Sequence, residues 1–345
     1  MTSSAPSDAI DRECMTRAIA AASDVRCVTS PNPWVGAVLR TTDGEMFQGA
    51  TQEPGGPHAE IVALRAGGER ARGATLYVTL EPCGHHGRTG PCTEAILAAG
   101  VARVVVGIED PDPRVGGMGA AALREAGVEV VLGVQADKVG LQLAPYLKHR
   151  RTGRPWVVLK LAATLDGGTA APNGSSQWIT SPAARVDGHR LRAESDAILV
   201  GAGTVRRDDP SLTVRDYQPP VEPSHRSLDP IRVVLGQAPP EAAVQPCRQM
   251  GGDLCRVLDE LGADGVLQLL VEGGAATAGE FHRSGLVDRY VIYVAPALFG
   301  GNDANALFDG TGAWDISEVW RGEFVAVERI GPDLRIEMAA AVEEG

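Results

Sequence analysis

Apolar positions in the first part of the chain recur with two different periods. One period, of three to four residues, is typical of helices. It predicts helices over residues 8–23, 58–66, 92–99 and 119–126. Short continuous apolar runs predict strands over residues 34–39, 75–80, 102–108 and 128–132. Because strands alternate with helices, we expect a mostly parallel sheet that is covered by helices on both faces.

The same alternation starts again in the second part of the chain. Strands are predicted over residues 156–162, 197–200, 231–235, 266–271 and 289–294, and helices over 183–194, 254–262 and 275–284. The final segments, 323–330 and 333–338, predict a hairpin across Gly331-Pro332. Residues 148–155 are basic and end in glycine and proline, which indicates a linker between two domains.

Length and composition indicate a two-domain enzyme. A chain of 345 residues exceeds one ordinary hydrophobic core, so we expect domains over residues 1–147 and 148–345. The net charge of −12 argues against broad binding to nucleic acid. No uncharged apolar run reaches the roughly 18 residues of a membrane span, and the first residues lack the pattern of a signal peptide. We therefore expect a cytoplasmic protein with reduced cysteines.

Two short stretches carry a candidate metal site. His58, Cys83 and Cys92 supply one imidazole and two thiolates, which can hold a tetrahedral zinc whose fourth position is open to water. An H-x-E motif followed by Pro-Cys and a second Cys is the signature of zinc nucleobase deaminases. We predict that Glu60 takes a proton from the zinc-activated water and passes protons to the ring nitrogen and the departing ammonia.

Other interpretations of these stretches remain open. His85 or His86 could supply a fourth ligand and close the zinc site, which would then be structural. The protein would in that case be a nucleotide-binding regulator. A deaminase of another base with a degenerate second domain is a further alternative. Activity on cytidine without consumption of NADPH would favour it.

A wider set of motifs points to one family. The run from Pro31 to Gly36, the His58-Ala59-Glu60 motif, the eight residues between Cys83 and Cys92, and the run from Asp110 to Pro113 together resemble the bifunctional deaminase/reductase family of riboflavin biosynthesis. The resemblance implies a cytidine-deaminase-like three-layer domain that deaminates 2,5-diamino-6-(5-phosphoribosylamino)pyrimidin-4(3H)-one. It also implies that Asn32 and Asp110 contact this substrate.

The second part of the chain lacks a G-x-G-x-x-G motif, so an ordinary Rossmann site is not supported. Gly273 and Gly274 lie between a predicted strand and a helix, where backbone N–H groups could hold a phosphate, although a plain tight turn fits as well. Segments 159–167, 176–180 and 203–210 resemble the family's reductase domain, which has a dihydrofolate-reductase-like α/β fold. This implies NADPH reduction of the ribosyl group of 5-amino-6-(5-phosphoribosylamino)uracil to a ribityl chain.

The resemblance also implies the contacts of this second site. The NADPH site would comprise Ala162, Trp178, Thr204, Asp208, Gly274, Ala275, Ala276, Thr277, Ala278, Gly279 and Glu280. The substrate would be held by Ser176, Arg192, Leu212, Arg215 and Glu272. Lys160 and Glu272 are expected at the reacting ribose, and the arginines suit its phosphate. By analogy with the family, we expect a homo-oligomer.

Several positions depart from the family's usual residues, among them Val62, Gly90 and Asp112, and three more bear on the predicted contacts. Thr51 stands where a histidine is usual, Gly168 replaces a basic residue, and Gly236 replaces a serine that can contact the nucleotide. None of the three removes a predicted zinc ligand or the predicted base.

Overall fold

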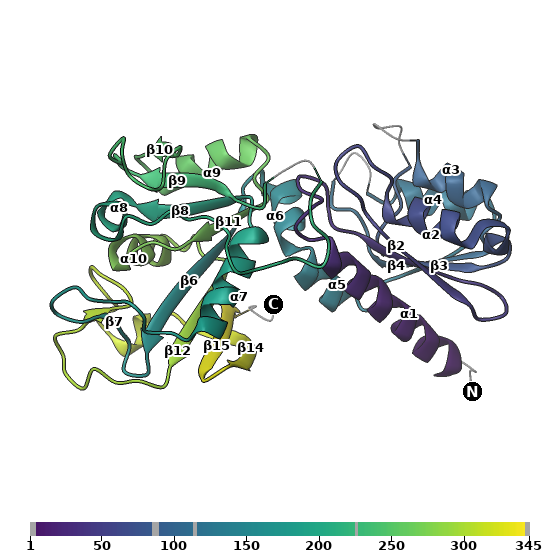
Figure 1. Cartoon of the computed structure of the whole chain (residues 1–345). Helices are drawn as coiled ribbons and strands as arrows, with labels where there is room; N and C mark the ends of the chain where they lie inside the picture. Colours follow the sequence, from purple (N-terminus) through teal and green to yellow (C-terminus); the bar gives the residue numbers. More distant parts are fainter. Residues whose placement is uncertain (1–4, 85–89, 113–115, 225–226, 342–345) are drawn as a thin grey trace. The chain divides into compact units, whose positions relative to one another are not determined.

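Two large β-sheets organise the chain, one in each of its two structural units (Figure 1). The computed structural model describes residues 5–84, 90–112, 116–224 and 227–341. The first unit comprises Met1–Gly153 with Pro219–His225, and the second comprises Arg154–Gln218 with Arg226–Gly345. In the described part of the chain, no helix is long and apolar enough to cross a membrane.

The sheet of the first unit mixes antiparallel and parallel pairs. Its order is β2-β1-β3-β4-β5. The strands are β1 (Gly36–Arg40), β2 (Met46–Ala50), β3 (Thr75–Leu80), β4 (Arg103–Ile108) and β5 (Glu129–Leu132). The β1–β2 and β1–β3 pairs are antiparallel, whereas β3, β4 and β5 run parallel. The prediction of a mostly parallel sheet missed β2 and its antiparallel hairpin with β1.

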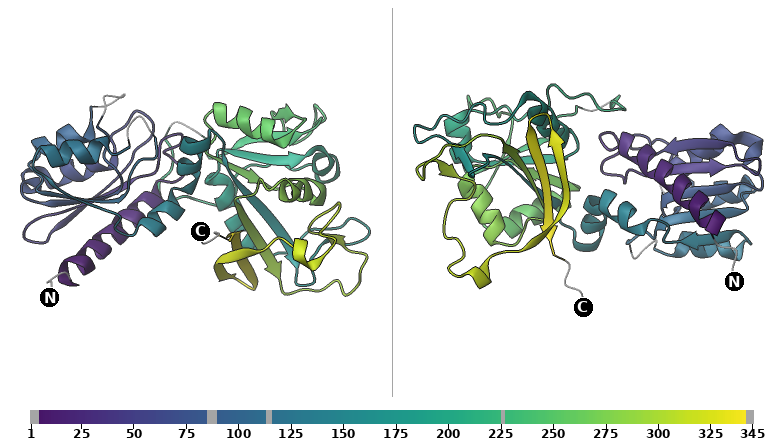
Figure 2. Two further views of the ribbon diagram at one scale, coloured as in Figure 1. Left: turned by 180° about the vertical axis from the view of Figure 1, so that it is seen from behind. Right: turned by 90° about the horizontal axis from the view of Figure 1, so that it is seen from below.

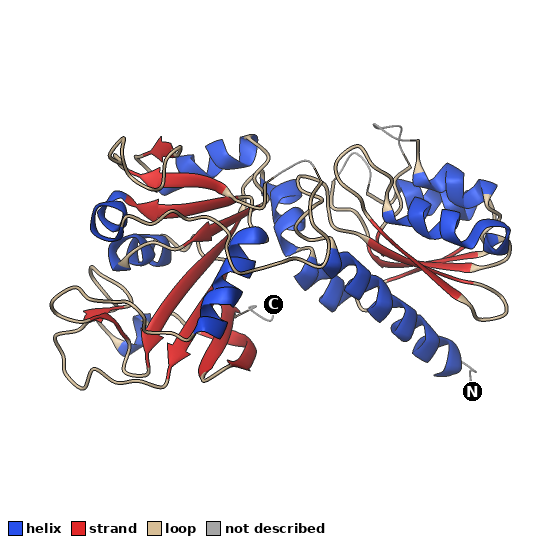
Figure 3. Ribbon diagram, in the orientation of Figure 1, coloured by secondary structure: helices blue, strands red, loops and turns tan. Residues whose placement is uncertain are grey.

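Helices cover both faces of this sheet, which makes three layers (Figure 3). They are α1 (Ala5–Asp24), α2 (Ala59–Gly67), η1 (Gly68–Ala71), α3 (Cys92–Ala98), α4 (Met118–Glu125), α5 (Ala136–Gln142) and α6 (Ala144–Thr152). Two glycines allow helices to approach the strands closely. A Cβ atom on Gly36 would lie 1.9 Å from the carbonyl oxygen of Ala18 in α1, and one on Gly49 would lie 2.2 Å from that of Ala59 in α2. Both positions therefore require glycine.

The second unit is built on a longer sheet, with the order β10-β9-β8-β11-β6-β12-β15-β14. The strands are β6 (Trp156–Thr164), β8 (Ala197–Gly201), β9 (Ile231–Leu235), β10 (Arg248–Met250), β11 (Gln268–Val271), β12 (Arg289–Ala295), β14 (Gly322–Ile330) and β15 (Asp333–Ala340). They are parallel from β10 to β12. The predicted hairpin of β14 and β15 continues the sheet in the antiparallel sense (Figure 2). A short pair, β7 (Gly168–Ala170) and β13 (Asn305–Ala306), stands apart from this sheet.

Apolar residues of the central strands fill two cores, one on each face of the second sheet. Leu269 packs with residues of α9 (Leu254–Ala263) and α10 (Ala275–Arg283), whereas Leu270 packs with residues of α7 (Pro182–Ala193) and α8 (Ala202–Asp208). Neighbouring residues of a strand point to opposite faces, so Leu269, Leu270 and Val271 are all apolar because β11 is covered on both sides. A short 3₁₀ helix, η2 (Ile316–Glu318), precedes β14.

The basic stretch after residue 147 differs from its prediction as a linker. Lys148 to Thr152 complete helix α6, and Gly153 ends this helix with a left-handed backbone (φ 73°). Basic side chains near a helix C-terminus interact favourably with the helix dipole, so this charge pattern is compatible with helix. The units therefore change at residues 153 and 154, just beyond the helix.

Candidate active sites

His58, Cys83 and Cys92 come together in the first unit. His58 lies directly before α2, Cys92 begins α3, and Cys83 follows the buried strand β3. Their potential ligand atoms all lie within 4.8 Å of one another. His58 Nδ1 is 3.2 Å from Cys92 Sγ and 3.6 Å from Cys83 Sγ. A tetrahedral zinc with ordinary bond lengths separates nitrogen and sulfur ligands by about 3.6 Å, so these residues fit the metal.

Glu60 lies in the first turn of α2 and is buried against this cluster. Burial raises the pKa of its carboxyl group, and the neighbouring His58 acts in the opposite direction. A buried carboxyl group with a raised pKa beside a metal site can both accept and return a proton. The position of Glu60 therefore suits the proton transfer that its sequence motif predicts.

The two cysteines differ in their acidity before a metal binds. A hydrogen bond with Cys92 lowers the pKa of Cys83, and the same interaction raises the pKa of Cys92. The backbone N–H of Cys92 also donates to Cys83 Sγ, at 3.4 Å. The cluster therefore holds one thiolate readily, and zinc would favour a second. His85 and His86, the alternative fourth ligands, lie outside the described residues.

Asp110 and Asn32 lie in loops of the same unit, and Glu81 holds the Asp110 loop. Glu81 accepts hydrogen bonds from the backbone N–H groups of Asp110, Gly117 and Ala120 at 3.2, 2.9 and 2.9 Å. Burial raises the pKa of Asp110, whose carboxylate accepts a hydrogen bond from Tyr146 at 3.2 Å. Asn32 is half-buried, and its N–H donates to the carbonyl oxygen of Thr29. The sequence motifs gave no signal for the role of Glu81.

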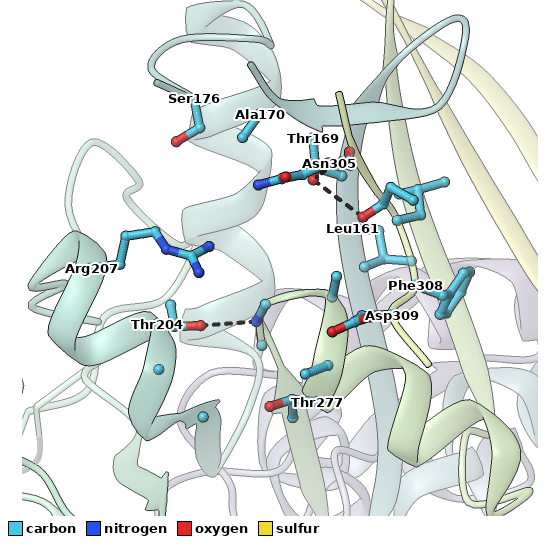
Figure 4. Close-up of a pocket in the computed structure, with 18 of the residues that line it drawn as sticks. Leu161, Thr169, Ala170, Ser176, Thr204, Arg207, Thr277, Asn305, Phe308 and Asp309 are labelled. Atoms are coloured by element: carbon cyan, nitrogen blue, oxygen red, sulfur yellow. Dashed lines mark hydrogen bonds between the residues drawn. The ribbon is translucent and has the colours of Figure 1, made fainter. Parts of the chain in front are cut away.

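The second unit contains a cavity of about 710 Å³, which is lined by residues at the carboxyl ends of β8 and β11 and by residues within β6 (Figure 4). Its lining includes ten of the residues predicted for the reductase site: Lys160, Ala162, Ser176, Thr204, Asp208, Glu272, Gly274, Ala275, Ala276 and Thr277. The predicted residues Trp178, Arg192, Leu212, Arg215, Ala278, Gly279 and Glu280 are not among the described residues that line it. Trp178 is 67% exposed and stacks on the Arg185 guanidinium.

Glu272 is the most strongly held charge at this cavity. Leu159 and Val271 are paired in parallel register, so Lys160 and Glu272 follow them side by side. Lys160 Nζ lies 3.9 Å from Glu272 Oε2, and Arg192 donates to both carboxylate oxygens. Burial alone would raise the pKa of Glu272, but the positive charges of Arg192 and Lys160 outweigh it and lower the pKa to about 2. Glu272 is therefore ionised at neutral pH.

Backbone groups before α10 form another wall of the cavity. The N–H of Gly274 donates to Thr204 Oγ1 at 3.0 Å, which ties this turn to α8 (Figure 4). A Cβ atom on Gly274 would lie 2.9 Å from the same oxygen, so a larger residue does not fit. The backbone N–H groups at a helix N-terminus suit a phosphate. The wall therefore fits the dinucleotide expected there.

Comparisons with known proteins agree with both sites. Residues 8–108 match the family model of the cytidine and deoxycytidylate deaminase zinc-binding region, and residues 155–336 match that of the RibD C-terminal domain. The chain belongs to the RibD family. It is 39% identical to the riboflavin biosynthesis protein RibD of Escherichia coli K12, over 96% of this chain and 100% of that protein. The RibD of Mycobacterium tuberculosis H37Rv is 43% identical, over 95% and 97% of the two chains.

Solved structures of RibD proteins have the same fold. One form of Acinetobacter baumannii RibD superposes with a TM-score of 0.89 at 36% identity and covers 97% of this chain and 100% of its own. A deaminase/reductase from Thermotoga maritima gives a TM-score of 0.84 at 32% identity, with the same coverage. The predicted fold class is confirmed. RibD membership also confirms a bifunctional deaminase and reductase of riboflavin biosynthesis, which uses zinc and NADPH.

Several cavity residues were missed by sequence reasoning. Thr169, Arg207, Asn305, Phe308 and Asp309 line the RibD reductase cavity, and the Arg207 side chain extends into it from α8 (Figure 4). The segment around Asn305 reaches the cavity through the pairing of β13 with β7. A two-residue strand has no detectable periodicity. No signal in the sequence could therefore have placed this segment.

Three of the departures from the family's usual residues, Thr51, Gly168 and Gly236, have local explanations. The Thr51 hydroxyl is buried and hydrogen-bonded to the backbone of Val35. A Cβ atom on Gly168 would lie 2.3 Å from the Phe299 ring, so a basic side chain cannot be accommodated without moving that ring. Gly236 has a φ of +100°, which disfavours serine. Each substitution thus fits its own surroundings in this chain.

Proposed function

We propose that residues 1–147 deaminate 2,5-diamino-6-(5-phosphoribosylamino)pyrimidin-4(3H)-one and that residues 148–345 reduce the product. The reductase substrate would be 5-amino-6-(5-phosphoribosylamino)uracil, whose ribosyl group becomes a ribityl chain. The two matched family regions, 8–108 and 155–336, fall inside these two parts of the chain. The approach of three ligand atoms beside buried Glu60 is the observation that carries the first assignment.

In the deaminase site, His58, Cys83 and Cys92 would hold zinc. When bound, zinc lowers the pKa of water and so makes a nucleophile available at neutral pH. Glu60 would accept one proton of that water and pass it to the ring nitrogen, and it would then carry the second proton of the water to the amino group, which leaves as ammonia. Its burial next to His58 supports this role. Asn32 and Asp110 would contact the substrate on its pyrimidine or phosphate side.

In the reductase site, the cavity would bind NADPH and the opened ribose together. NADPH supplies the hydride that reduces C1′. Nucleotide contacts are proposed for Ala162, Trp178, Thr204, Asp208, Gly274, Ala275, Ala276, Thr277, Ala278, Gly279 and Glu280. Lys160 and Glu272 would face the reacting ribose, because they lie together at the cavity wall.

The substrate end of the reductase site would include Ser176, Arg192, Leu212 and Arg215. Arg192 already donates three hydrogen bonds, two to Glu272 and one to the carbonyl oxygen of Thr213. Arg215 is exposed, and it donates from Nη1 to the hydroxyl groups of Ser211 and Thr213. Its remaining N–H groups leave Arg215 better suited than Arg192 to bind the substrate phosphate.

A homo-oligomer is also proposed, with the edge strand β14 in the contact between copies. β14 ends the strand order and exposes Phe324 and Val327, with 68% and 56% of their surface accessible. Trp314 and Ile316, in the segment before β14, are 95% and 74% exposed. An exposed edge strand with large apolar side chains favours association with another chain. A cytoplasmic location is proposed because the six cysteines, all within the described residues, form no disulfide bond and because the enzyme uses NADPH.

A coupled assay tests the two proposed activities. Zinc-loaded protein receives the diaminopyrimidine substrate, and ammonia and NADPH are followed separately. Glu60→Gln should lower ammonia release by about 10²- to 10⁴-fold. It should leave NADPH consumption intact when the aminouracil intermediate is supplied directly. Removal of zinc by a chelator should have the same selective effect. Loss of both activities in Glu60→Gln would contradict the assignment of separate sites.

A further inference from the structure

The segment from Ser211 to Asp216 holds an unfavourable backbone conformation next to the reductase site. Leu212 and Asp216 have φ angles of 53° and 57°, in the left-handed region that residues other than glycine rarely adopt. Such a conformation persists only where surrounding groups hold it, and it often marks a functional segment. Leu212 is buried, whereas Arg215 is exposed. The segment is therefore held in the protein interior at Leu212, whereas the Arg215 side chain is accessible to a ligand.

Three side chains hold the backbone of this segment. His189 Nδ1 accepts a hydrogen bond from the N–H of Arg215 at 3.0 Å. Arg192 Nη1 donates to the carbonyl oxygen of Thr213 at 3.0 Å, and Asp229 Oδ1 accepts from the N–H of Val214 at 2.8 Å. His189 and Arg192 are three residues apart on α7 and so lie on the same face of that helix. Helix α7 thus holds the segment through one hydrogen-bond acceptor, His189, and one donor, Arg192.

The acceptor role fixes the protonation state of His189. An imidazole nitrogen accepts a hydrogen bond only when it carries no proton, so the proton of His189 is on Nε2. The side chain is buried, and the charged groups that face it are Arg192, Arg215, Asp216 and Glu272. Burial lowers the pKa of His189, and the two arginines lower it further, whereas the two carboxylates oppose them. The imidazole is therefore neutral at neutral pH.

We propose that His189 is a positioning residue for substrate binding in the reductase. In its neutral form it holds the backbone at Arg215 and so places the Arg215 guanidinium for the substrate phosphate. Protonation would turn the acceptor nitrogen into a donor that faces the N–H of Arg215, and the contact would be lost. This inference rests on the proposed reductase function. It predicts that the affinity for substrate, but not for NADPH, weakens as His189 becomes charged.

Three variants of the full chain separate positioning from packing. His189→Leu removes the acceptor, His189→Asn keeps an oxygen near the position of Nδ1, and His189→Gln places its amide closer to the position of Nε2. We expect His189→Leu and His189→Gln to raise the KM for the aminouracil substrate about tenfold, the size of a lost buried hydrogen bond. The KM for NADPH should change less than twofold. His189→Asn should restore most of the substrate KM.

The pH profile provides an independent measurement. In the wild type, the substrate KM should rise as the pH falls below the ordinary histidine pKa of about 6.5, and the rise should be smaller in His189→Asn, where the substrate phosphate still titrates but residue 189 cannot be protonated. ¹⁵N NMR of histidine-labelled protein should show the Nε2–H tautomer of His189, which is identified as the signal that is missing in His189→Asn. If His189→Leu does not fold, the dependence of the substrate KM on pH in His189→Asn tests the proposal by itself.

Two results would overturn the proposal about His189. One is an unchanged substrate KM in His189→Leu, and the other is an acid-dependent rise in His189→Asn equal to that of the wild type. A wild type that consumes no NADPH with this substrate would instead refute the proposed reductase function. In that case the NMR tautomer and the amide signal of Arg215 still test whether His189 holds the segment. A doubly protonated His189 at neutral pH would refute it.

Discussion

Arg192 and Glu272 are joined by two parallel hydrogen bonds, from Nε to Oε1 at 2.7 Å and from Nη2 to Oε2 at 2.9 Å. The pair links the end of α7 to the end of β11, which are 80 residues apart in the sequence. Both side chains are largely buried. Two-point pairing of arginine with a carboxylate fixes orientation as well as charge. Helix α7 therefore controls where the Glu272 carboxylate stands at the reductase cavity.

Arg192→Met should destabilise the second unit strongly. It leaves the buried Glu272 carboxylate without its two-point partner, with Lys160 Nζ still 3.9 Å away, and loss of one partner of a buried pair costs about 3 kcal/mol or more. Urea denaturation should show this in the free energy of unfolding, and the double variant Arg192→Met/Glu272→Met should recover most of the loss. Arg256→Met, in the exposed pair with Glu260, is the matched control and should cost less than about 1 kcal/mol. Equal losses in the two single variants would contradict this account.

The stability of the second unit should depend on pH through Glu272. Its folded pKa of about 2 lies below the ordinary value of 4.5, so the unfolded state binds a proton first as the pH falls. The stabilisation by the ionised carboxylate is complete above about pH 5 and is lost progressively towards pH 2. Unfolding free energies of the wild type and Glu272→Gln should therefore converge on acidification. A difference that stays constant from pH 6 to pH 3 would be inconsistent with the lowered pKa.

Thr204→Val should weaken NADPH binding without affecting deamination. The change keeps the side-chain shape but removes the acceptor for the Gly274 N–H, so the turn before α10 is held less firmly. We expect the KM for NADPH to rise roughly tenfold, in line with a lost hydrogen bond at a partly buried site. Thr204→Ser retains the hydroxyl and should resemble the wild type. If Thr204→Ser and Thr204→Val raise the KM equally, the hydroxyl is not the cause.

Prediction of the elements succeeded where the chain is apolar over a whole strand. Thr75–Leu80 and Ile231–Leu235 have the predicted boundaries, because the first is entirely apolar or β-branched and only Arg232 interrupts the second. Met46–Ala50 was missed, since glutamine and glycine interrupt its pattern and its pairing with β1 stabilises it. The segment 148–152 was predicted as a linker, because it is basic and shows no apolar periodicity. The buried residues of its helix, Pro145, Tyr146 and Leu147, all precede it.

The zinc cluster was predictable because its residues belong to short local motifs. His58 and Glu60 are two residues apart, and prolines precede both His58 and Cys92. Such spacing is a property of the chain itself and needs no knowledge of distant contacts. The same holds for the strand, glycine pair and helix from residue 268 to residue 283.

The sequence by itself thus determined the order of most of the longer helices and strands, the two-part organisation of the chemistry and the identity of the residues able to hold zinc. Only the tertiary structure decided how Arg192 divides its donors between Glu272 and Thr213, how His189 meets Arg215, and that Asn305 lines the cavity. The physical reason is that these contacts join segments far apart in the chain. Their geometry depends on the sheet that brings the segments together, and it cannot be read from the local periodicity of the sequence.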